Sequence, residues 1–225
     1  MGRISVITCD ASRKKHPSAE VGIERICENE IVNISLVRGS KRFLRRALAR
    51  HNIDRAVLDG DMPEYVTDEL EKSFIRVYDG QKLARMLLPE FISRAAKQDR
   101  RNQTCTIYDD TLDEESMDII NLASLKFRYV SLCTQCARAY EVAHIIQGLT
   151  GLSLKIGESK GGVAIVRTGK GGDQDIKISL SDLHKTVFVD EKKRKIPAPL
   201  AEAIAGNEFG EDILDKLHLK IYKYY

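Results

Sequence analysis

Short apolar runs and one amphipathic segment alternate along the first third of the chain. The apolar runs that predict strands cover residues 3–8, 22–26, 31–37, 55–58 and 75–78. The second and third runs are close enough to pair as an antiparallel hairpin through Glu28 and Asn29. Residues 40–51 place apolar side chains on one helical arc and arginines on the opposite arc. This region is therefore predicted to hold a hairpin and an amphipathic helix.

Regular alternation of strands and helices is predicted for the middle of the chain. A helix is expected over residues 81–97, with a kink at Pro89 because proline cannot supply the N–H that a helix interior needs. The elements predicted after it are strands at 104–108, 129–132 and 152–156 and helices at 113–126 and 135–147. Since parallel strands need crossover connections, this order favours a parallel sheet covered by helices.

The pattern changes after residue 160. Residues 163–168 and 175–180 predict a C-terminal β-hairpin, because the glycines between them adopt positive φ without strain. A strand near residues 185–190 follows, then a helix from Pro197 to Ile204 and helical spacing over residues 212–225. The fold class expected is α/β: Rossmann-like, with a mostly parallel sheet, flanking helices, an N-terminal hairpin and a C-terminal β-hairpin.

One polar stretch, residues 98–103, resembles a linker because it is charged and lacks apolar periodicity. We therefore expect an N-terminal α/β domain over residues 1–100 and a Rossmann-like domain over residues 101–225, with one large domain as the alternative. Hydrophobic residues make up 43% of the chain and charged residues 31%, which suits a globular protein that folds alone.

Charge, cysteine content and hydropathy narrow the cellular setting. The 36 basic and 33 acidic residues leave a net charge of only +3, so no strong field attracts nucleic acid or an anionic membrane. The chain opens with an apolar run before its basic residues, the reverse of a secretion signal, and no run approaches about 18 apolar residues. Five widely spaced cysteines fit reduced thiols. These features favour a cytoplasmic protein without membrane association.

Several predicted strands run directly into aspartates. The aspartates at such strand ends are Asp10, Asp59, Asp61, Asp79, Asp109 and Asp110. Ligands of open α/β sheets bind outside the carboxyl ends of strands, where carboxylates hold hydroxyl groups or metals. We therefore predict a ligand site near Asp109, Asp110, Thr134 and Gly157. The alternative, and the commoner pattern, is that each aspartate caps the helix that follows it.

Glycine-rich segments supply a second set of candidate ligand residues. The chain has no G-x-G-x-x-G motif after its first strand and no P-loop order, so neither the dinucleotide-binding motif nor the P-loop is present. Lys160 and Gly161, in the run GESKGG, and Lys170, in the run GKGG, are predicted to contact an anion, with plain turn formation as the alternative. No metal ligands are assigned, and the cofactor is left open.

Two further features suggest other functions. Cys133 and Cys136 form a C-x-x-C motif where a helix start would lower a thiol pKa, although structural cysteines are commoner and no second motif completes a zinc site. Residues 38–55 hold seven basic residues and one acidic residue, which suits either a solvated helix face or contacts with nucleic-acid phosphates. The tail IYKYY suits docking on its own domain or on a second subunit of a homo-oligomer.

The sequence therefore predicts a small-molecule or nucleotide-binding α/β protein whose catalytic activity stays undecided. A noncatalytic regulatory or interaction module, nucleic-acid binding through the basic helix at 38–55, and thiol redox chemistry are the alternatives. The basic helix is interpreted first as a solvated face, so nucleic acid is not the expected partner.

Overall fold

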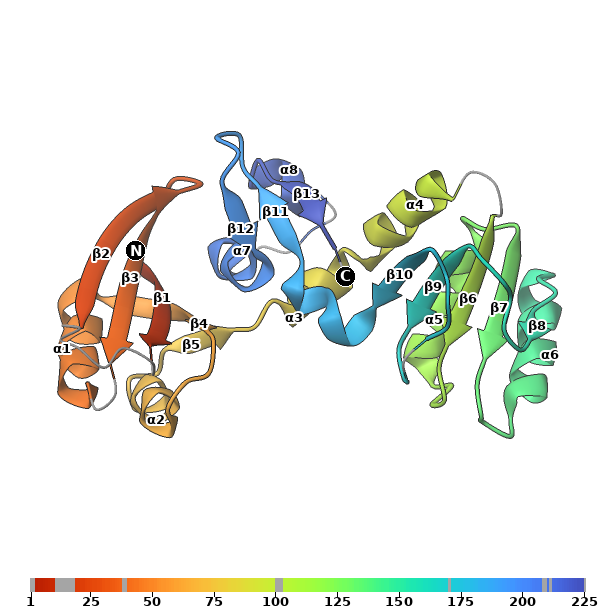
Figure 1. Ribbon diagram of the computed structural model, residues 1–225, viewed down its shortest axis with the longest axis horizontal. Helices are drawn as coiled ribbons and strands as arrows, with labels where there is room; N and C mark the ends of the chain where they lie inside the picture. Colours follow the sequence, from red (N-terminus) through yellow and green to blue (C-terminus); the bar gives the residue numbers. More distant parts are fainter. Residues whose placement is uncertain are drawn as a thin grey trace. The chain divides into compact units, whose positions relative to one another are not determined.

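A computed structural model describes residues 3–10, 19–37, 40–99, 103–169, 171–207, 210 and 212–224 of the protein. These residues form two compact units (Figure 1). The first unit joins residues 1–83 to residues 184–223, and the second comprises residues 84–183 with the last two residues of the chain. Each unit contains its own five-stranded β-sheet, mostly parallel in the first unit and wholly parallel in the second.

The first unit is built on a five-stranded sheet with the order β2-β3-β1-β4-β5. Its strands are β1 (Arg3–Asp10), β2 (Glu20–Ile26), β3 (Asn29–Val37), β4 (Ile53–Asp59) and β5 (Arg76–Tyr78). β2 and β3 form the predicted antiparallel hairpin, with Cys27 and Glu28 at positive φ in its turn. The other neighbouring strands pair in parallel.

Two amphipathic helices bury their apolar faces in the core of this unit. α1 (Lys41–His51) confirms the predicted helix and buries Leu44 and Leu48. α2 (Glu64–Lys72), which was not predicted, begins after Pro63 and buries residues one helical turn apart. Its apolar positions are few because Glu69 occupies one of the buried sites.

The C-terminal part of the first unit contains a three-stranded antiparallel sheet and two helices. Its elements are β11 (Val187–Val189), β12 (Lys195–Pro197), α7 (Ala198–Ala205), α8 (Ile213–Lys216) and β13 (Lys220–Lys223). The predicted tail helix is wrong beyond residue 216. There the chain forms β13, which pairs with β11, because Leu219 and Ile221 alternate as buried strand residues do. Tyr225 lies outside the described residues.

Helix α7 lies against strands β1, β4 and β5 of the first sheet. Gly80, at φ +83°, lies so near this helix that an added Cβ would approach the Pro199 nitrogen to 2.8 Å. Only glycine combines that backbone conformation with that approach. This contact helps to place residues 184–223 with the first unit.

The second unit has the elements expected of a Rossmann-like fold. They are α4 (Leu88–Gln98), β6 (Thr104–Tyr108), α5 (Glu114–Ser124), β7 (Tyr129–Cys133), α6 (Ala139–Thr150), β8 (Lys155–Ile156), β9 (Val163–Val166) and β10 (Ile176–Ser179). α3 (Gln81–Met86) and the 3₁₀ helix η1 (Leu180–Lys185) span the divisions between units. The expected interruption at Pro89 is confirmed, because the helix stops at Met86 and α4 begins at Leu88.

Strand order in the second unit is β8-β7-β6-β9-β10, and every neighbouring pair is parallel. β6 lies in the middle of the sheet. β7 and β8 follow on one side of it, and β9 and β10 on the other. This arrangement matches the first five strands of the Rossmann order, 3-2-1-4-5. The predicted α/β, Rossmann-like fold class is confirmed.

The hairpin predicted between residues 163–168 and 175–180 is wrong. β9 and β10 run parallel, and residues 167–175 lead the chain back to the start of β10. All four residues of β9 are buried, as is typical of a strand covered on both faces of a parallel sheet. The antiparallel hairpin of this region is instead formed by β11 and β12.

The two compact units do not divide the chain at residue 100, where the sequence predicted a domain boundary. The linker segment 98–103 falls within the second unit, between α4 and β6, and its residues 100–102 lie outside the described part of the chain. Residues 184–223 belong to the first unit. The division into independently folding domains stays a prediction. In the described part of the chain, no helix has the length and hydropathy that crossing a bilayer requires.

Candidate functional site

The predicted strand-end residues meet at the carboxyl edge of the sheet in the second unit. Asp109 follows β6, Thr134 follows β7 and Gly157 follows β8. Backbone bonds continue across this edge: the Asp109 N–H donates to Cys133 O at 3.1 Å, and the Gly157 N–H donates to Leu132 O at 2.8 Å. The order of strands reverses beside β6, between β6 and β9, which is where open α/β sheets place ligands.

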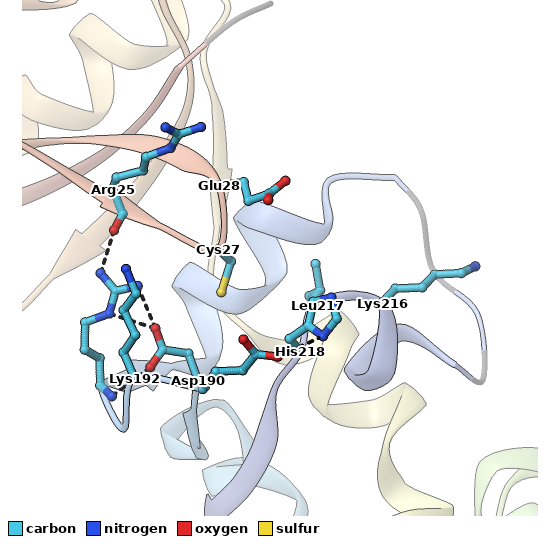
Figure 2. A pocket seen from close by; sticks show the side chains of 10 residues that line it. Arg25, Cys27, Glu28, Asp190, Lys192, Lys216, Leu217 and His218 are labelled. Atoms are coloured by element: carbon cyan, nitrogen blue, oxygen red, sulfur yellow. Dashed lines mark hydrogen bonds and ion pairs between the residues drawn. The ribbon is translucent and has the colours of Figure 1, made fainter.

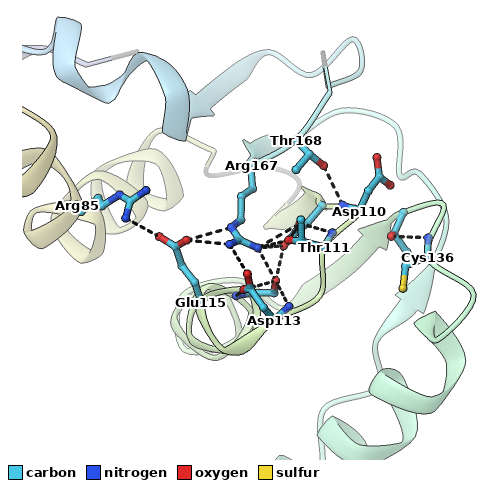
Figure 3. Close-up of polar contacts among 11 residues, drawn as sticks. Arg85, Asp110, Thr111, Asp113, Glu115, Cys136, Arg167 and Thr168 are labelled. Atoms are coloured by element: carbon cyan, nitrogen blue, oxygen red, sulfur yellow. Dashed lines mark hydrogen bonds and ion pairs between the residues drawn. The ribbon is translucent and has the colours of Figure 1, made fainter.

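An arginine from the far side of that reversal fills this position (Figure 3). Arg167, just after β9, donates to Asp109 Oδ2 at 3.1 Å, Asp113 Oδ2 at 2.6 Å and Glu115 Oε2 at 2.9 Å. It also contacts the hydroxyl groups of Thr111 and Ser116. Three carboxylates thus compete for one guanidinium, so Arg167 is already satisfied and is poorly placed to bind an anionic ligand.

Asp109 is committed to the same network. Its side chain is fully buried, and it accepts hydrogen bonds from Thr111 Oγ1 at 2.7 Å and Ser116 Oγ at 2.5 Å. Burial by itself raises the pKa of Asp109, but the hydrogen bonds from Ser116, Thr111 and Arg167 outweigh burial and lower it. Asp109 is thus an ionised carboxylate held by the strand-end network, and the helix that follows, α5, is capped by Asp113 and not by Asp109.

Asp110 and Thr134 lie at the exposed rim of this edge. Asp110 Oδ1 accepts the Gln135 N–H at 2.7 Å, and its own N–H donates to Thr168 Oγ1 at 2.8 Å. Thr134 Oγ1 accepts the Cys136 N–H at 3.0 Å. Both side chains therefore stabilise the turns that follow β6 and β7.

One face of the sheet bonds to two glycine-rich loops, residues 157–162 and 167–175. Tyr108 donates to Glu158 Oε1 at 2.6 Å and contacts the Gln174 amide. Gln174 Nε2 donates to Ser159 O at 3.1 Å, which joins the two loops. Burial and the neighbouring Glu158 carboxylate raise the pKa of Tyr108 to about 12. The loops are thus fixed to the sheet through polar groups.

The remaining predicted residues, Lys160 and Gly161, do not join the carboxyl edge, and Lys170 lies outside the described residues. Lys160 lines a pocket of about 440 Å³ whose other residues include the first residues of β6 and β7. The complete lining is Thr104, Tyr129, Val130, Ser131, Ser153, Lys155, Ser159 and Lys160. Gly161 is adjacent in the chain and adopts φ +71°, which suits glycine. The predicted ligand residues therefore lie in two places, one at the carboxyl edge of the sheet and the other at this pocket.

Hydrogen-bond donors dominate this pocket, which we call the lysine pocket. Lys155 Nζ donates to Glu158 O at 3.1 Å, one of the three bonds that an ammonium group can donate. Ser131 and Ser159 share one hydrogen bond at 2.6 Å, so one hydroxyl proton of the pair is left to donate elsewhere. The described residues of the lining include two lysines and no carboxylate. Such a lining favours an anion.

The thiol pair does not match the redox hypothesis. α6 begins at Ala139, three residues after Cys136, so neither cysteine starts the helix. Burial, with the carboxylates of Glu158 and Asp110, raises the pKa of Cys133, whereas the hypothesis required a lowered value. These features favour the structural alternative for Cys133, and redox chemistry of the pair stays a hypothesis.

The basic helix α1 divides its cations between structure and solvent. Arg45 donates to both carboxylate oxygens of Glu69, at 2.7 and 3.0 Å, and Lys41 lies 3.4 Å from the same carboxylate. Arg42, Arg46 and Arg50 are exposed, and Arg38 lies outside the described residues. The nucleic-acid alternative stays a prediction.

A larger pocket of about 580 Å³ lies in the first unit and has mixed charge (Figure 2). Arg194 pairs with Asp190 at 2.6 Å and donates to Arg25 O, and His218 Nδ1 lies 3.3 Å from Glu191. Because these charges largely pair with one another, the pocket does not favour an anionic ligand over a cationic one. In the described part of the chain, no three His, Cys, Asp or Glu side chains gather as metal ligands do.

Comparisons with known proteins leave the family open. No family model matches the chain, and no curated protein matches it. One similar solved structure is L-tryptophan dehydrogenase from Nostoc punctiforme, with 5% identity and a TM-score of 0.37 over 96% of this chain and 79% of that chain. A likeness this weak supports no conclusion about ligand or activity.

Three important residues were not predicted from the sequence. Arg167 follows the buried run VAIV. An arginine directly after a buried strand could have indicated the strand-end network from the sequence alone. Lys155 and Tyr129 are the first residues of short strands, and only the strand pairing brings them to the same pocket.

Proposed function

We propose that this protein binds a small molecule through its phosphate or carboxylate group, which Lys155 and Lys160 hold in the lysine pocket. The observation that carries the proposal is a pocket lined by two ammonium groups and several hydroxyls, without a carboxylate among its described residues. Catalysis is not part of the proposal.

The chemistry of the two strand edges supports this choice. At the carboxyl edge the guanidinium of Arg167 is neutralised by Asp109, Asp113 and Glu115. In the lysine pocket both ammonium groups retain donors, because Lys155 donates one hydrogen bond, to Glu158 O, and Lys160 pairs with no carboxylate among the described residues. Charged donors bind oxyanions more strongly than neutral donors do.

Ligand binding to the native state raises the melting temperature, so matched compounds test the proposal. We expect ribose 5-phosphate to stabilise the protein at low ionic strength and ribose to have no effect. Lys160→Gln should weaken the binding of ribose 5-phosphate about tenfold, because a hydrogen bond to a charged group contributes about 1.5 to 3 kcal/mol. Titration calorimetry would measure the change.

Lys97→Gln is the matched control, since Lys97 is an exposed lysine of the same unit outside the pocket. It should leave the affinity unchanged. Equal affinity of the wild-type protein and a Lys155→Gln, Lys160→Gln double variant would rule the site out, and so would the absence of any response to phosphate- or carboxylate-bearing compounds.

A further inference from the structure

We infer that the lysine pocket takes a mononucleotide, with the base stacked on Tyr129 and the phosphate held by Lys155 and Lys160. This inference rests on the proposed function and adds the class of ligand. It starts from an aromatic ring that the fold leaves uncovered at the pocket.

Tyr129 is a fixed aromatic surface. It is the first residue of β7, and its N–H donates to Gln103 O at 3.1 Å, as does the N–H of Arg128 at 3.0 Å. The side chain is nevertheless 54% exposed, although Val130 and Leu132 of the same strand are buried. A held backbone with an open ring suits stacking, because little freedom is lost when a ligand binds.

Strand register places the ring on the same side of the sheet as the cations. Side chains two residues apart in a strand share a face, so Tyr129 and Ser131 point to the same side. Ser131 pairs directly with Lys155 of β8, and its hydroxyl bonds to Ser159, next to Lys160. One face therefore presents an aromatic ring beside a donor-rich pocket.

Arg128 adds to this surface. Its guanidinium carbon lies 5.4 Å from the centroid of the Tyr129 ring, which is within the range of a cation–π contact. The contact helps to hold the ring, and it places a positive charge beside Tyr129.

The size of the pocket favours more than an inorganic anion. Its volume of about 440 Å³ falls within the range of small-molecule sites, roughly 300 to 1,000 Å³. A phosphate would occupy only the lysine end. The hydroxyl groups of Thr104 and Ser153, which also line the pocket, suit the hydroxyls of a ribose.

The test compares AMP with ribose 5-phosphate, which differ by the base, in calorimetric titrations of the full-length protein. AMP should bind the wild-type protein about tenfold more tightly, because stacking on an aromatic ring contributes about 1 to 3 kcal/mol per base. Tyr129→Ala should remove this preference, so that the ratio of the two affinities falls from about ten to about one. Tyr129→Phe keeps the ring and should keep the preference.

Two results would overturn the inference while leaving the proposed function intact. They are equal affinities of the wild-type protein for AMP and ribose 5-phosphate, and an undiminished AMP preference in Tyr129→Ala. Failure of both compounds to bind the wild-type protein would instead overturn the proposed function along with the inference. An unchanged melting temperature of the ligand-free Tyr129→Ala protein would show that the variant is folded.

Discussion

Asp109 and Asp110 are neighbours in the chain, but their side chains have opposite environments. Asp109 is 1% exposed and bonds to Ser116, Thr111 and Arg167, whereas Asp110 is exposed and accepts one backbone N–H. A buried carboxylate that loses its charge leaves its cation partly uncompensated, and an exposed one does not. Asp109 therefore has a structural role, whereas Asp110 is a surface residue.

Asp109→Asn should lower the free energy of unfolding by about 3 kcal/mol, the lower end for a broken buried ion pair, because Arg167 retains Asp113 and Glu115. Asp110→Asn should change it by no more than about 0.5 kcal/mol. Urea denaturation of both variants would measure this difference. Equal effects would show that the Arg167 network does not stabilise the fold.

At the scale of the element, a single carboxylate connects two helices of the first unit. Glu69 of α2 is almost fully buried, and it accepts from Arg45 and contacts Lys41, both on α1. The hydrogen bond from Arg45 is the main cause that lowers the pKa of Glu69 to about 2. The ionised form is therefore favoured in the folded protein.

This lowered pKa predicts how stability depends on pH. A carboxylate with a depressed pKa contributes its full stabilisation above its unfolded pKa, near 4.5, and loses it as the pH falls toward 2. Glu69→Gln should therefore destabilise the protein at pH 7, and the difference from wild type should shrink between about pH 5 and pH 2. Urea denaturation across this range would measure it. Glu71→Gln, at an exposed glutamate of the same helix, should show no such trend.

At the scale of the whole molecule, the chain leaves the first unit after residue 83, returns to it at residue 184 and leaves it again for its last two residues. The second unit is one continuous segment, residues 84–183, apart from the last two residues, and its sheet forms wholly within that segment. Residues 184–223 instead contact strands β1, β4 and β5 through α7. Continuity of this kind favours independent folding of the second unit.

Two fragments would distinguish this division from the one expected at residue 100. The fragment 84–183 should be soluble and should unfold cooperatively, because it retains α4 with buried Phe91 and Ile92. The fragment 101–225 should aggregate, since it lacks α4 and leaves α7 without its strands. Circular dichroism during thermal unfolding would compare them. Cooperative folding of 101–225 would support the sequence-based boundary instead.

Local pattern was enough to predict most elements, because each depends on neighbours along the chain. Helical spacing predicted α1, and a proline after Leu88 predicted the interruption between α3 and α4. The same local signals failed for β9 and β10, where glycines between two apolar runs suit a tight turn or a longer return equally well. Periodicity indicates which side chains are buried, but it does not indicate whether two neighbouring strands run parallel or antiparallel.

The sequence by itself determined the α/β class, the positions of most strands and the gathering of Asp109, Thr134 and Gly157 at one edge, since parallel strands share their carboxyl ends. Only the tertiary structure decided that Arg167 neutralises that edge, and that Lys160 lies instead with Lys155 and Tyr129. These are contacts between residues distant in the chain. They depend on strand order and register, which the packing of the whole sheet sets.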